Sequence, residues 1–213
     1  MQDYLKAIYK LTQAEHKVNP SAIAERMGVS AASVTNMMKK LADLKLVRHT
    51  PYQDVELTPL GRKVALEVIR HHRLLELYLA EALGYSWDRV HDEAEKLEHH
   101  ISEEFETKIA QTLGDPTHDP HGDPIPTREG TLDEAVYGNL ATTPGEGQSA
   151  VVCRVSDESA DRLRYLAALG LRPDVTFTVI ERAPFNGPIR LRLGQKEVNL
   201  GVELAGDVFV EPV

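Results

Sequence analysis

A short stretch from His91 to His100 concentrates side chains that bind metal ions. On a helix, which turns by about 100° per residue, part of this set falls within an arc of roughly 100°. These side chains are His91, Glu95, Glu98 and His99. Upstream, His72 and Glu76 are four residues apart and share one face of another predicted helix. Imidazole and carboxylate groups without a thiolate suit Mn, Fe(II), Co or Zn. The spacing therefore predicts a metal site, and the alternative is that these helices simply face water.

The same ligand types also activate water in metallohydrolases, which makes an enzyme the second hypothesis. Such an enzyme needs an open coordination position and a substrate cleft. The chain contains no His-Glu-x-x-His sequence, and no nucleophile motif accompanies the cluster. We therefore expect a metal-binding protein that is not an enzyme and has no catalytic residues.

Length, charge and cysteine content limit the class of protein. The chain has 213 residues and a net charge of -9. Residues 1 to 70 hold 11 Lys+Arg against 7 Asp+Glu, a balance of +4. Residues 71 to 213 hold the other 13 Lys+Arg against 26 Asp+Glu, a balance of -13. The basic part can face phosphates although the whole chain is acidic. No apolar run approaches the ~20 residues of a membrane helix, the start lacks a signal-peptide pattern, and Cys153 is the only cysteine. We expect a cytoplasmic protein without disulfides and without a membrane partner.

Residues 1–62 have the pattern of a DNA-binding module. After a first amphipathic helix, Ser21 is expected to cap a short helix that Gly28 ends, and Ser30 to cap a longer one. Residues 46–57 read as a two-stranded hairpin with a polar tip. Three helices followed by a hairpin predict a winged helix-turn-helix.

The third helix of this module carries small, hydroxylated and amide side chains at its start. Such side chains let a helix approach a major groove and read base edges, while nearby cations contact phosphates. The side chains expected to contact DNA are Ser30, Ser33, Thr35, Asn36, Lys39, Lys40, Arg48 and Tyr52. One alternative is a winged helix that binds protein, and another is a metal-independent winged-helix protein with an acidic dimer surface.

The rest of the chain divides into a helical part and a β part. Residues 63–130 are expected to form a helical metal-binding and dimerisation domain, with Ser86 capping one of its helices, because long amphipathic helices beyond a DNA-binding unit commonly pack against a second copy. Residues 131–148 read as a proline- and glycine-rich linker. Short apolar strands and one helix at 161–169 predict an SH3-like β-barrel in residues 149–213. The expected fold is mainly α with small β parts.

Three motifs accompany the helix-turn-helix and the SH3-like unit. They are His72-Arg-Leu-Leu-Glu76, Val90-His91-Asp-Glu-Ala-Glu95-Lys-Leu-Glu98-His99 and Pro120-His-Gly-Asp-Pro-Ile-Pro126. In this combination the chain resembles, over essentially its whole length, the iron- and manganese-dependent repressors of the diphtheria-toxin-repressor family. The resemblance implies a metal-dependent transcriptional regulator that represses metal-uptake genes and binds a double-stranded DNA operator as a homodimer.

The resemblance also implies a primary metal site. Its ligands would be Asp3, Glu95, Glu98 and His99. Iron-type members carry a methionine at the position of Asp3 and a cysteine at that of Glu95, so two hard carboxylates here favour Mn²⁺. Fe²⁺ is the alternative, and Co²⁺ or Zn²⁺ would bind in vitro because their intrinsic affinity exceeds that of Mn²⁺. The ion is expected to join the DNA-binding domain to the dimerisation domain and so to fix the spacing of the recognition helices.

A second, ancillary metal site is implied in the same way. The residues that match it are His72, Glu76 and His91. Lys6 stands where manganese-type members have a glutamate that helps to bridge two metals, and an ammonium there repels a second cation. The resemblance also places Arg154 and Asp157 where iron-type members have ligands in the SH3-like domain, and of the two only Asp157 can ligate. His118 and His121, in the proline-rich stretch, are not expected to bind metal.

Overall fold

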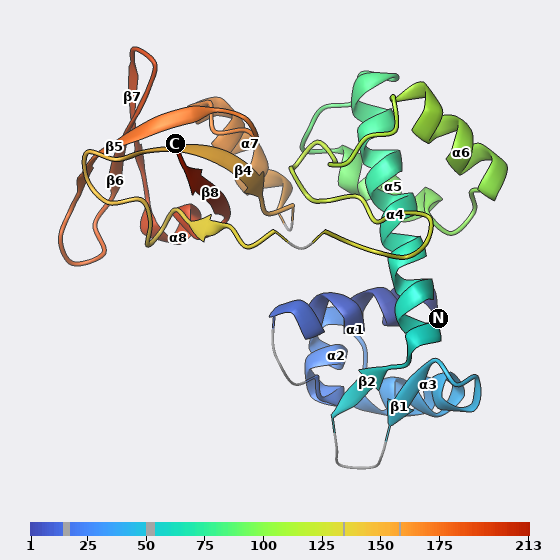
Figure 1. Cartoon of the computed structure of the whole chain (residues 1–213). Helices are drawn as coiled ribbons and strands as arrows, with labels where there is room; N and C mark the ends of the chain where they lie inside the picture. The colour runs from blue at the N-terminus through green and yellow to red at the C-terminus, as the bar shows by residue number, and fades with distance from the viewer. Residues whose placement is uncertain (15–17, 50–53, 134, 158) are drawn as a thin grey trace. The chain divides into compact units, whose positions relative to one another are not determined.

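A computed structural model describes residues 1–14, 18–49, 54–133, 135–157 and 159–213 (Figure 1). The chain forms two compact units. The first comprises Met1–His72, Glu98–Ile101 and Pro126–Leu132, and the second Arg73–Leu97, Ser102–Ile125 and Asp133–Val213. Within the described ranges, none of the helices combines the length and the apolar character that a membrane span requires.

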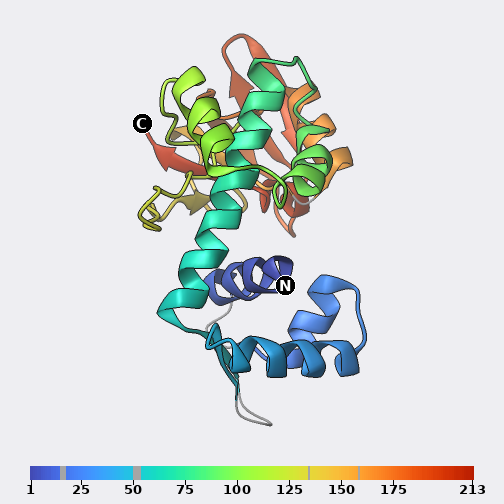
Figure 2. The same ribbon diagram turned by 90° about the vertical axis from the view of Figure 1, so that its right-hand side faces the viewer.

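The first unit contains the winged helix-turn-helix that the sequence predicts (Figures 1 and 2). Its elements are α1 (Gln2–Ala14), α2 (Pro20–Met27), α3 (Ala31–Asp43), β1 (Val47–His49), β2 (Val55–Leu57) and the start of α4 (Pro59–Glu81). The two strands pair antiparallel, with Arg48 opposite Glu56. Fully buried apolar side chains on the inner faces of α1 and α3, among them Ile8, Val34 and Met38, form its core.

Capping residues set the ends of α2 and α3. Gly28 ends α2 in the left-handed conformation at φ 62°, and the Ser30 side chain accepts a hydrogen bond from the Ser33 N–H at the start of α3. The expected cap of α2 at Ser21 is wrong. Asn19 caps the helix by accepting from the Ala22 N–H at 2.9 Å, because a proline follows it at the first helical position, where its missing N–H costs nothing.

The helical part of the second unit contains α5 (Val90–Leu97) and α6 (Glu103–Thr112) as well as the end of α4. Two boundaries differ from the expectation. The helix expected from Ser86 begins only at Val90. The second difference is a break between α5 and α6. Helix α5 ends at Leu97 and α6 begins after Ser102, whose side-chain oxygen accepts a hydrogen bond from the Phe105 N–H. No glycine or proline marks this second break, so the sequence pattern alone did not indicate it.

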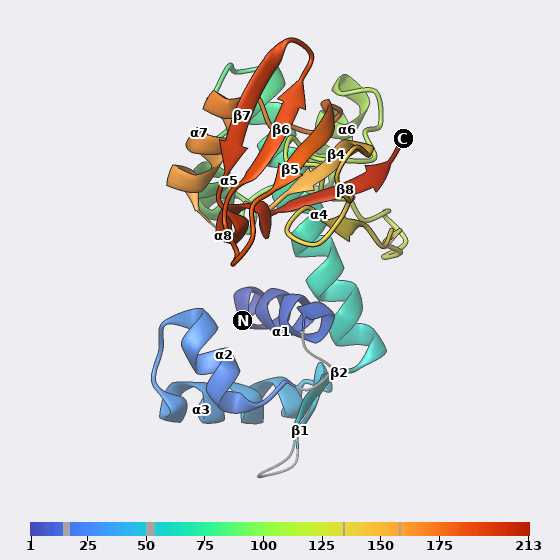
Figure 3. The same cartoon turned by 90° about the vertical axis from the view of Figure 1, so that its left-hand side faces the viewer.

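The C-terminal part of the second unit is a six-stranded antiparallel sheet in the order β3-β8-β4-β5-β6-β7 (Figure 3). Its elements are β3 (Gly138–Asn139), β4 (Ser149–Val155), α7 (Ala160–Leu169), β5 (Thr176–Arg182), β6 (Ile189–Leu193), β7 (Lys196–Leu200), α8 (Val202–Ala205) and β8 (Val208–Pro212). This is the predicted SH3-like unit, but the pairings among the described residues do not join β3 to β7, so the sheet stays open. Strand β3 falls within the stretch predicted as a linker, where Leu140 is fully buried in the core of the sheet.

Candidate metal centre

Three of the expected ligands meet in the first unit. Ligand atoms of Asp3, Glu98 and His99 all lie within 4.8 Å of one another, and we call this group the first centre. His99 Nε2 contacts Asp3 Oδ1 and lies 3.5 Å from Glu98 Oε1. Asp3 stands in the first turn of α1, whereas the other two residues follow the last residue of α5. Two segments far apart in the sequence thus bring together two carboxylates and one imidazole.

The single helical face that the sequence predicted for these ligands is wrong. Because α5 ends at Leu97, Glu98 and His99 lie in the turn that follows it rather than on the helix. Glu95 remains on α5, where its side chain is exposed, and His91 belongs to a different cluster in the second unit.

Glu98 is the buried member of the first centre, with 1% of its surface exposed. Its two oxygens accept hydrogen bonds from Lys6 Nζ at 3.0 and 2.7 Å, and His72 Nδ1 lies 2.5 Å from Oε2. Burial opposes ionisation, but the hydrogen bond from His72 and the charge of Lys6 outweigh it and hold the pKa of Glu98 below its usual value. A charged carboxylate therefore faces Asp3 and His99.

A second cluster forms around Glu76 in the second unit, and we call it the second centre. Glu76 Oε1 and Asp157 Oδ2 lie 3.1 and 3.2 Å from the same atom, His91 Nδ1. The hydrogen bonds with Asp157 and Glu76 outweigh burial and raise the pKa of His91 to about 10. The expected ligands Glu76 and His91 are therefore in contact, and the SH3-like part contributes Asp157. His72, the third residue expected here, contacts Glu98 in the first unit.

The opposite side of Glu76 faces two residues that the sequence analysis did not count as ligands. Ligand atoms of Glu76, Asp119 and His121 lie within 4.8 Å of one another, and all three residues are buried. Burial lowers the pKa of His121, but the neighbouring Glu76 and Asp119 outweigh it and raise the pKa to about 9. Burial and the charges of Glu76 and Asp123 raise the pKa of Asp119. The sequence did offer one sign of this site, the histidine between two prolines in Pro120–Pro124. The composition of that stretch is typical of an exposed loop, however, and so argued against a buried ligand.

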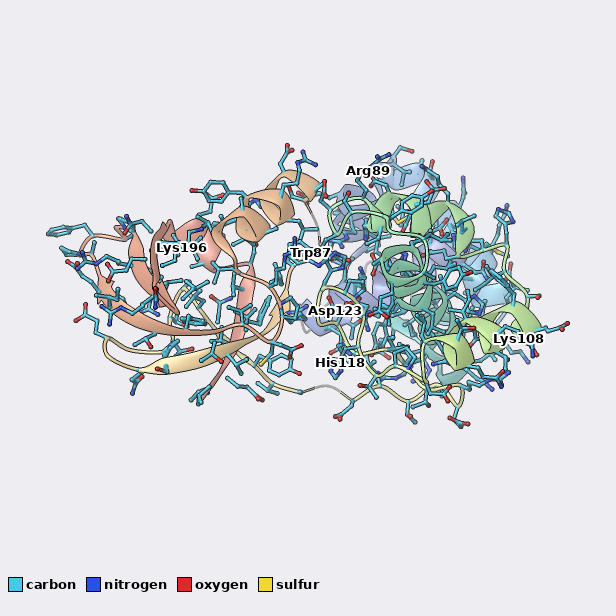
Figure 4. All side chains as sticks on the ribbon, turned by 90° about the horizontal axis from the view of Figure 1, so that it is seen from above. Trp87, Arg89, Lys108, His118, Asp123 and Lys196 are labelled. Carbon is cyan, nitrogen blue, oxygen red and sulfur yellow. The ribbon has the colours of Figure 1, made fainter. Side chains whose placement is uncertain are left out.

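The loop that carries His121 is fixed on several sides. The His121 ring lies against the Trp87 ring with centroids 5.3 Å apart, and Trp87 Nε1 donates to the Pro120 carbonyl at 2.8 Å. The Val155 N–H of β4 donates to the His121 carbonyl at 2.8 Å. Asp119 Oδ1 accepts from the N–H groups of His121 and Asp123 (Figure 4 labels Trp87 and Asp123). The side chains of the second centre are thus held before any ion binds.

Gly122 allows this loop to approach β4 closely. Its φ is +88°, and a Cβ placed on it would lie 2.0 Å from the Cys153 carbonyl oxygen. We expect Gly122→Ala to lower the free energy of unfolding by about 2–4 kcal/mol, because the backbone of the loop or of β4 must shift. Gly147→Ala is the matched control, since its φ of +76° is similar but nothing lies within 4 Å of the added carbon. Equal losses in urea denaturation of the two variants would contradict the proposed close approach.

The donor atoms fit divalent ions at both centres. Within the described part of the chain, Asp3 Oδ1 in the first centre and His121 Nδ1 in the second are buried and have no hydrogen-bond partner. The 3.7 Å from His121 Nδ1 to Glu76 Oε2 is too long for a hydrogen bond. The two atoms are close enough for both to reach one ion with bonds of about 2.0–2.2 Å. Oxygen and imidazole donors without sulfur are typical of Mn²⁺, Fe²⁺ and related ions.

The expected DNA-contacting residues gather on the exposed face of α3 and on the hairpin. Val34 and Met38 are buried and Met37 packs against the same core, whereas the polar side chains of this segment are exposed. Those exposed on α3 are Ser33, Thr35, Asn36, Lys39 and Lys40, with Ser30 as the exposed cap. Arg48 on β1 is exposed and lies 3.8 Å from Glu56. Tyr52 lies outside the described residues.

Family models match nearly the whole chain. Residues 1–55 match the N-terminal DNA-binding domain of iron-dependent repressors, and residues 58–127 match their metal-binding and dimerisation domain. Residues 141–212 match the FeoA domain. The three matched segments follow the chain in the order of the winged helix, the helical part and the SH3-like sheet.

Similar proteins agree with these matches. The iron-dependent repressor IdeR of Mycobacterium tuberculosis is 34% identical over 99% of this chain and 96% of its own, and the diphtheria toxin repressor of Corynebacterium diphtheriae is 31% identical over 98% and 95%. A solved manganese-dependent transcriptional repressor in complex with manganese has a TM-score of 0.90 at 39% identity and covers 100% of this chain and 99% of its own. ScaR with bound Zn²⁺ has a TM-score of 0.81 at 33% identity, with coverage of 100% and 99%. The chain therefore belongs to the diphtheria-toxin-repressor family of metal-dependent, DNA-binding transcriptional repressors.

Proposed function

We propose that the protein is a manganese-dependent repressor of metal-uptake genes that binds its operator as a homodimer. The observation that carries the choice of metal is the ligand set of the first centre, Asp3, Glu98 and His99, which offers hard oxygen and imidazole donors and no sulfur. The similar repressor solved with manganese supports this choice. Because other relatives are named iron-dependent repressors, an Fe²⁺-dependent regulator is the alternative.

In this proposal the first centre controls the position of α1. A bound divalent ion supplies positive charge that the carboxylates of Asp3 and Glu98 can share. Asp3 belongs to α1, whereas Glu98 and His99 belong to a segment far along the chain, so ligation by all three favours the arrangement in which the two segments touch. Glu95, the fourth ligand implied by the family pattern, stays a prediction.

The second centre is proposed as a further site for a divalent ion. Glu76 and His91 retain the roles expected from the sequence, and His72 stays a predicted ligand. Asp157 from the SH3-like part extends this set, as do Asp119 and His121 from the proline-rich loop. Because these residues come from α4, α5, the loop and the segment just after β4, an ion here would hold the helical and SH3-like parts together.

The proposed DNA surface is the exposed face of α3 with the hairpin. Asn36 and the hydroxyl groups near the start of α3 would contact base edges and phosphates, and Lys39, Lys40, Arg48 and Tyr52 would contact phosphates. The proposed division of the chain is 1–62 for DNA binding, 63–130 for metal binding and dimerisation, and 149–213 for the SH3-like domain. The expected linker at 131–148 is shortened, because β3 and Leu140 belong to the SH3-like sheet. A homodimer would present two α3 helices to half-sites about one DNA turn apart.

A metal-by-metal titration of DNA binding tests this function. The metal-stripped protein is mixed with a labelled fragment of its own promoter region, and fluorescence anisotropy is recorded as Mn²⁺, Fe²⁺, Co²⁺ or Zn²⁺ is added. We expect Mn²⁺ to tighten binding by about 100-fold, which corresponds to about 2.7 kcal/mol of coupling. Chelator should reverse the effect. Binding that is equally tight with and without metal would contradict a metal-dependent repressor, and stimulation by Fe²⁺ but not Mn²⁺ would favour the iron-dependent alternative.

A further inference from the structure

Lys6 places a fixed positive charge inside the first unit. This lysine of α1 is only 6% exposed, and its Nζ donates to both oxygens of Glu98, at 2.7 and 3.0 Å. His72 Nδ1 lies 3.2 Å from the same Nζ. One side of the Glu98 carboxylate is therefore occupied by an ammonium group, while His99 Nε2 approaches the same carboxylate at 3.5 Å from Oε1.

This arrangement has two opposing effects on metal binding. A buried ion pair between α1 and the turn after α5 holds these two segments together, and losing one partner of such a pair is strongly destabilising. The same ammonium also repels a divalent ion that shares Glu98 with it, because like charges within a few ångströms interact strongly in a partly buried site. Lys6 thus performs part of the task of a bound ion and at the same time lowers the affinity for that ion.

We infer that Lys6 sets the metal concentration at which the first centre fills, by holding α1 on Glu98 in the metal-free protein and by weakening ion binding. The inference rests on the proposed function, since it needs an ion at Asp3, Glu98 and His99. It differs from a purely structural role for Lys6. If Lys6 were only structural, its removal would loosen the fold and weaken metal binding. If Lys6 also competes with the ion, its removal loosens the metal-free fold but tightens metal binding.

The test replaces Lys6 by methionine, which keeps the apolar stem and removes the charge, and by glutamine, which can still donate a hydrogen bond to Glu98. Lys6→Arg keeps the charge, and Lys10→Met makes the same change one turn along α1. Mn²⁺ affinity of the full chain is measured by equilibrium dialysis. Each variant is also studied with Asp3→Ala added. The difference in Mn²⁺ binding with and without Asp3→Ala then gives the contribution of the first centre alone. Amide hydrogen exchange of α1 is measured without metal.

We expect Lys6→Met and Lys6→Gln to tighten Mn²⁺ binding at the first centre by about tenfold, and Lys6→Met to speed amide exchange in metal-free α1. Lys6→Arg and Lys10→Met should leave both quantities near the wild-type values. Unchanged or weaker Mn²⁺ affinity in both neutral variants would overturn the inference while leaving the proposed function intact. If the wild-type chain itself shows no Asp3-dependent uptake of Mn²⁺, the proposed first centre fails, and the inference fails with it.

Discussion

Replacing Asp3 by alanine is expected to lower metal-stimulated operator binding by about 100-fold and to leave the metal-free protein folded. Asp3 supplies one of the two carboxylates of the first centre, and its loss removes both a ligand and a negative charge. The side chain is 45% exposed and its described contact is with His99, so its removal leaves no buried charge uncompensated. The measurement is the ratio of operator affinities with and without Mn²⁺, with thermal unfolding as the check on the fold.

Asp161→Ala is the control for this prediction, because Asp161 is an aspartate in the first turn of α7 with 87% of its side chain exposed. It should keep the full response to Mn²⁺. Glu98 is a poorer choice for the same experiment, since removing it would leave Lys6 buried without its carboxylate and would unfold the unit for reasons unrelated to metal. An Asp3→Ala protein that still responds to Mn²⁺ like the wild type would exclude Asp3 as a ligand.

Metal binding at the second centre is expected to release about two protons per chain at pH 7 and to tighten by up to about 100-fold per pH unit below pH 9. The pKa values of His91 and His121 are raised to about 10 and about 9, so both rings carry a proton in the metal-free protein at neutral pH. An imidazolium has no free lone pair and must lose its proton before it binds an ion. Higher pH therefore favours the ion until both rings are neutral, and the affinity should level off above pH 10.

The same pKa values determine how the metal-free fold responds to pH. Because both are raised above the ordinary value of 6.5, the two histidines stabilise the fold fully below pH 6.5 and lose this contribution as the pH rises through 9 to 10. Calorimetric titration with Mn²⁺ in buffers of different ionisation enthalpy measures the protons released. His121→Ala should reduce the number by about one, and His118→Ala, which changes an exposed histidine outside the cluster, should not. Proton release that does not depend on His121 would contradict its assignment as a ligand.

The sequence predicted the fold where local signals agree with the final packing. Gly28 and Ser30 mark the turn between α2 and α3, and the apolar spacing of α3 matches its buried face. The prediction was wrong where the chain changes direction without a glycine or proline. The end of α5 at Leu97 is such a place, because residues 98–101 keep a composition that suits a helix but pack with the first unit instead.

The helical arc identified candidate ligands by residue type but placed them on one face. The family resemblance instead divided them into two groups, and in the structure Asp3, Glu98 and His99 lie together and Glu76 and His91 lie together. Asp119 and His121 were missed for a different reason. Their loop is rich in proline and glycine, which indicates an exposed connection, but contacts with distant segments bury it, among them the hydrogen bonds with Trp87 and Val155. Such contacts between distant segments leave no local pattern in the sequence.

The contact between Trp87 and His121 gives the molecule an intrinsic optical probe. The chain has one tryptophan, and its indole ring lies beside the imidazole whose proton must leave when the second centre takes up an ion. Neutral and protonated imidazole quench indole emission to different extents, so the fluorescence of the unlabelled protein would report occupancy of this centre alone. Filling of the two centres could then be followed separately in a single titration, with anisotropy of labelled DNA recording the response of the operator.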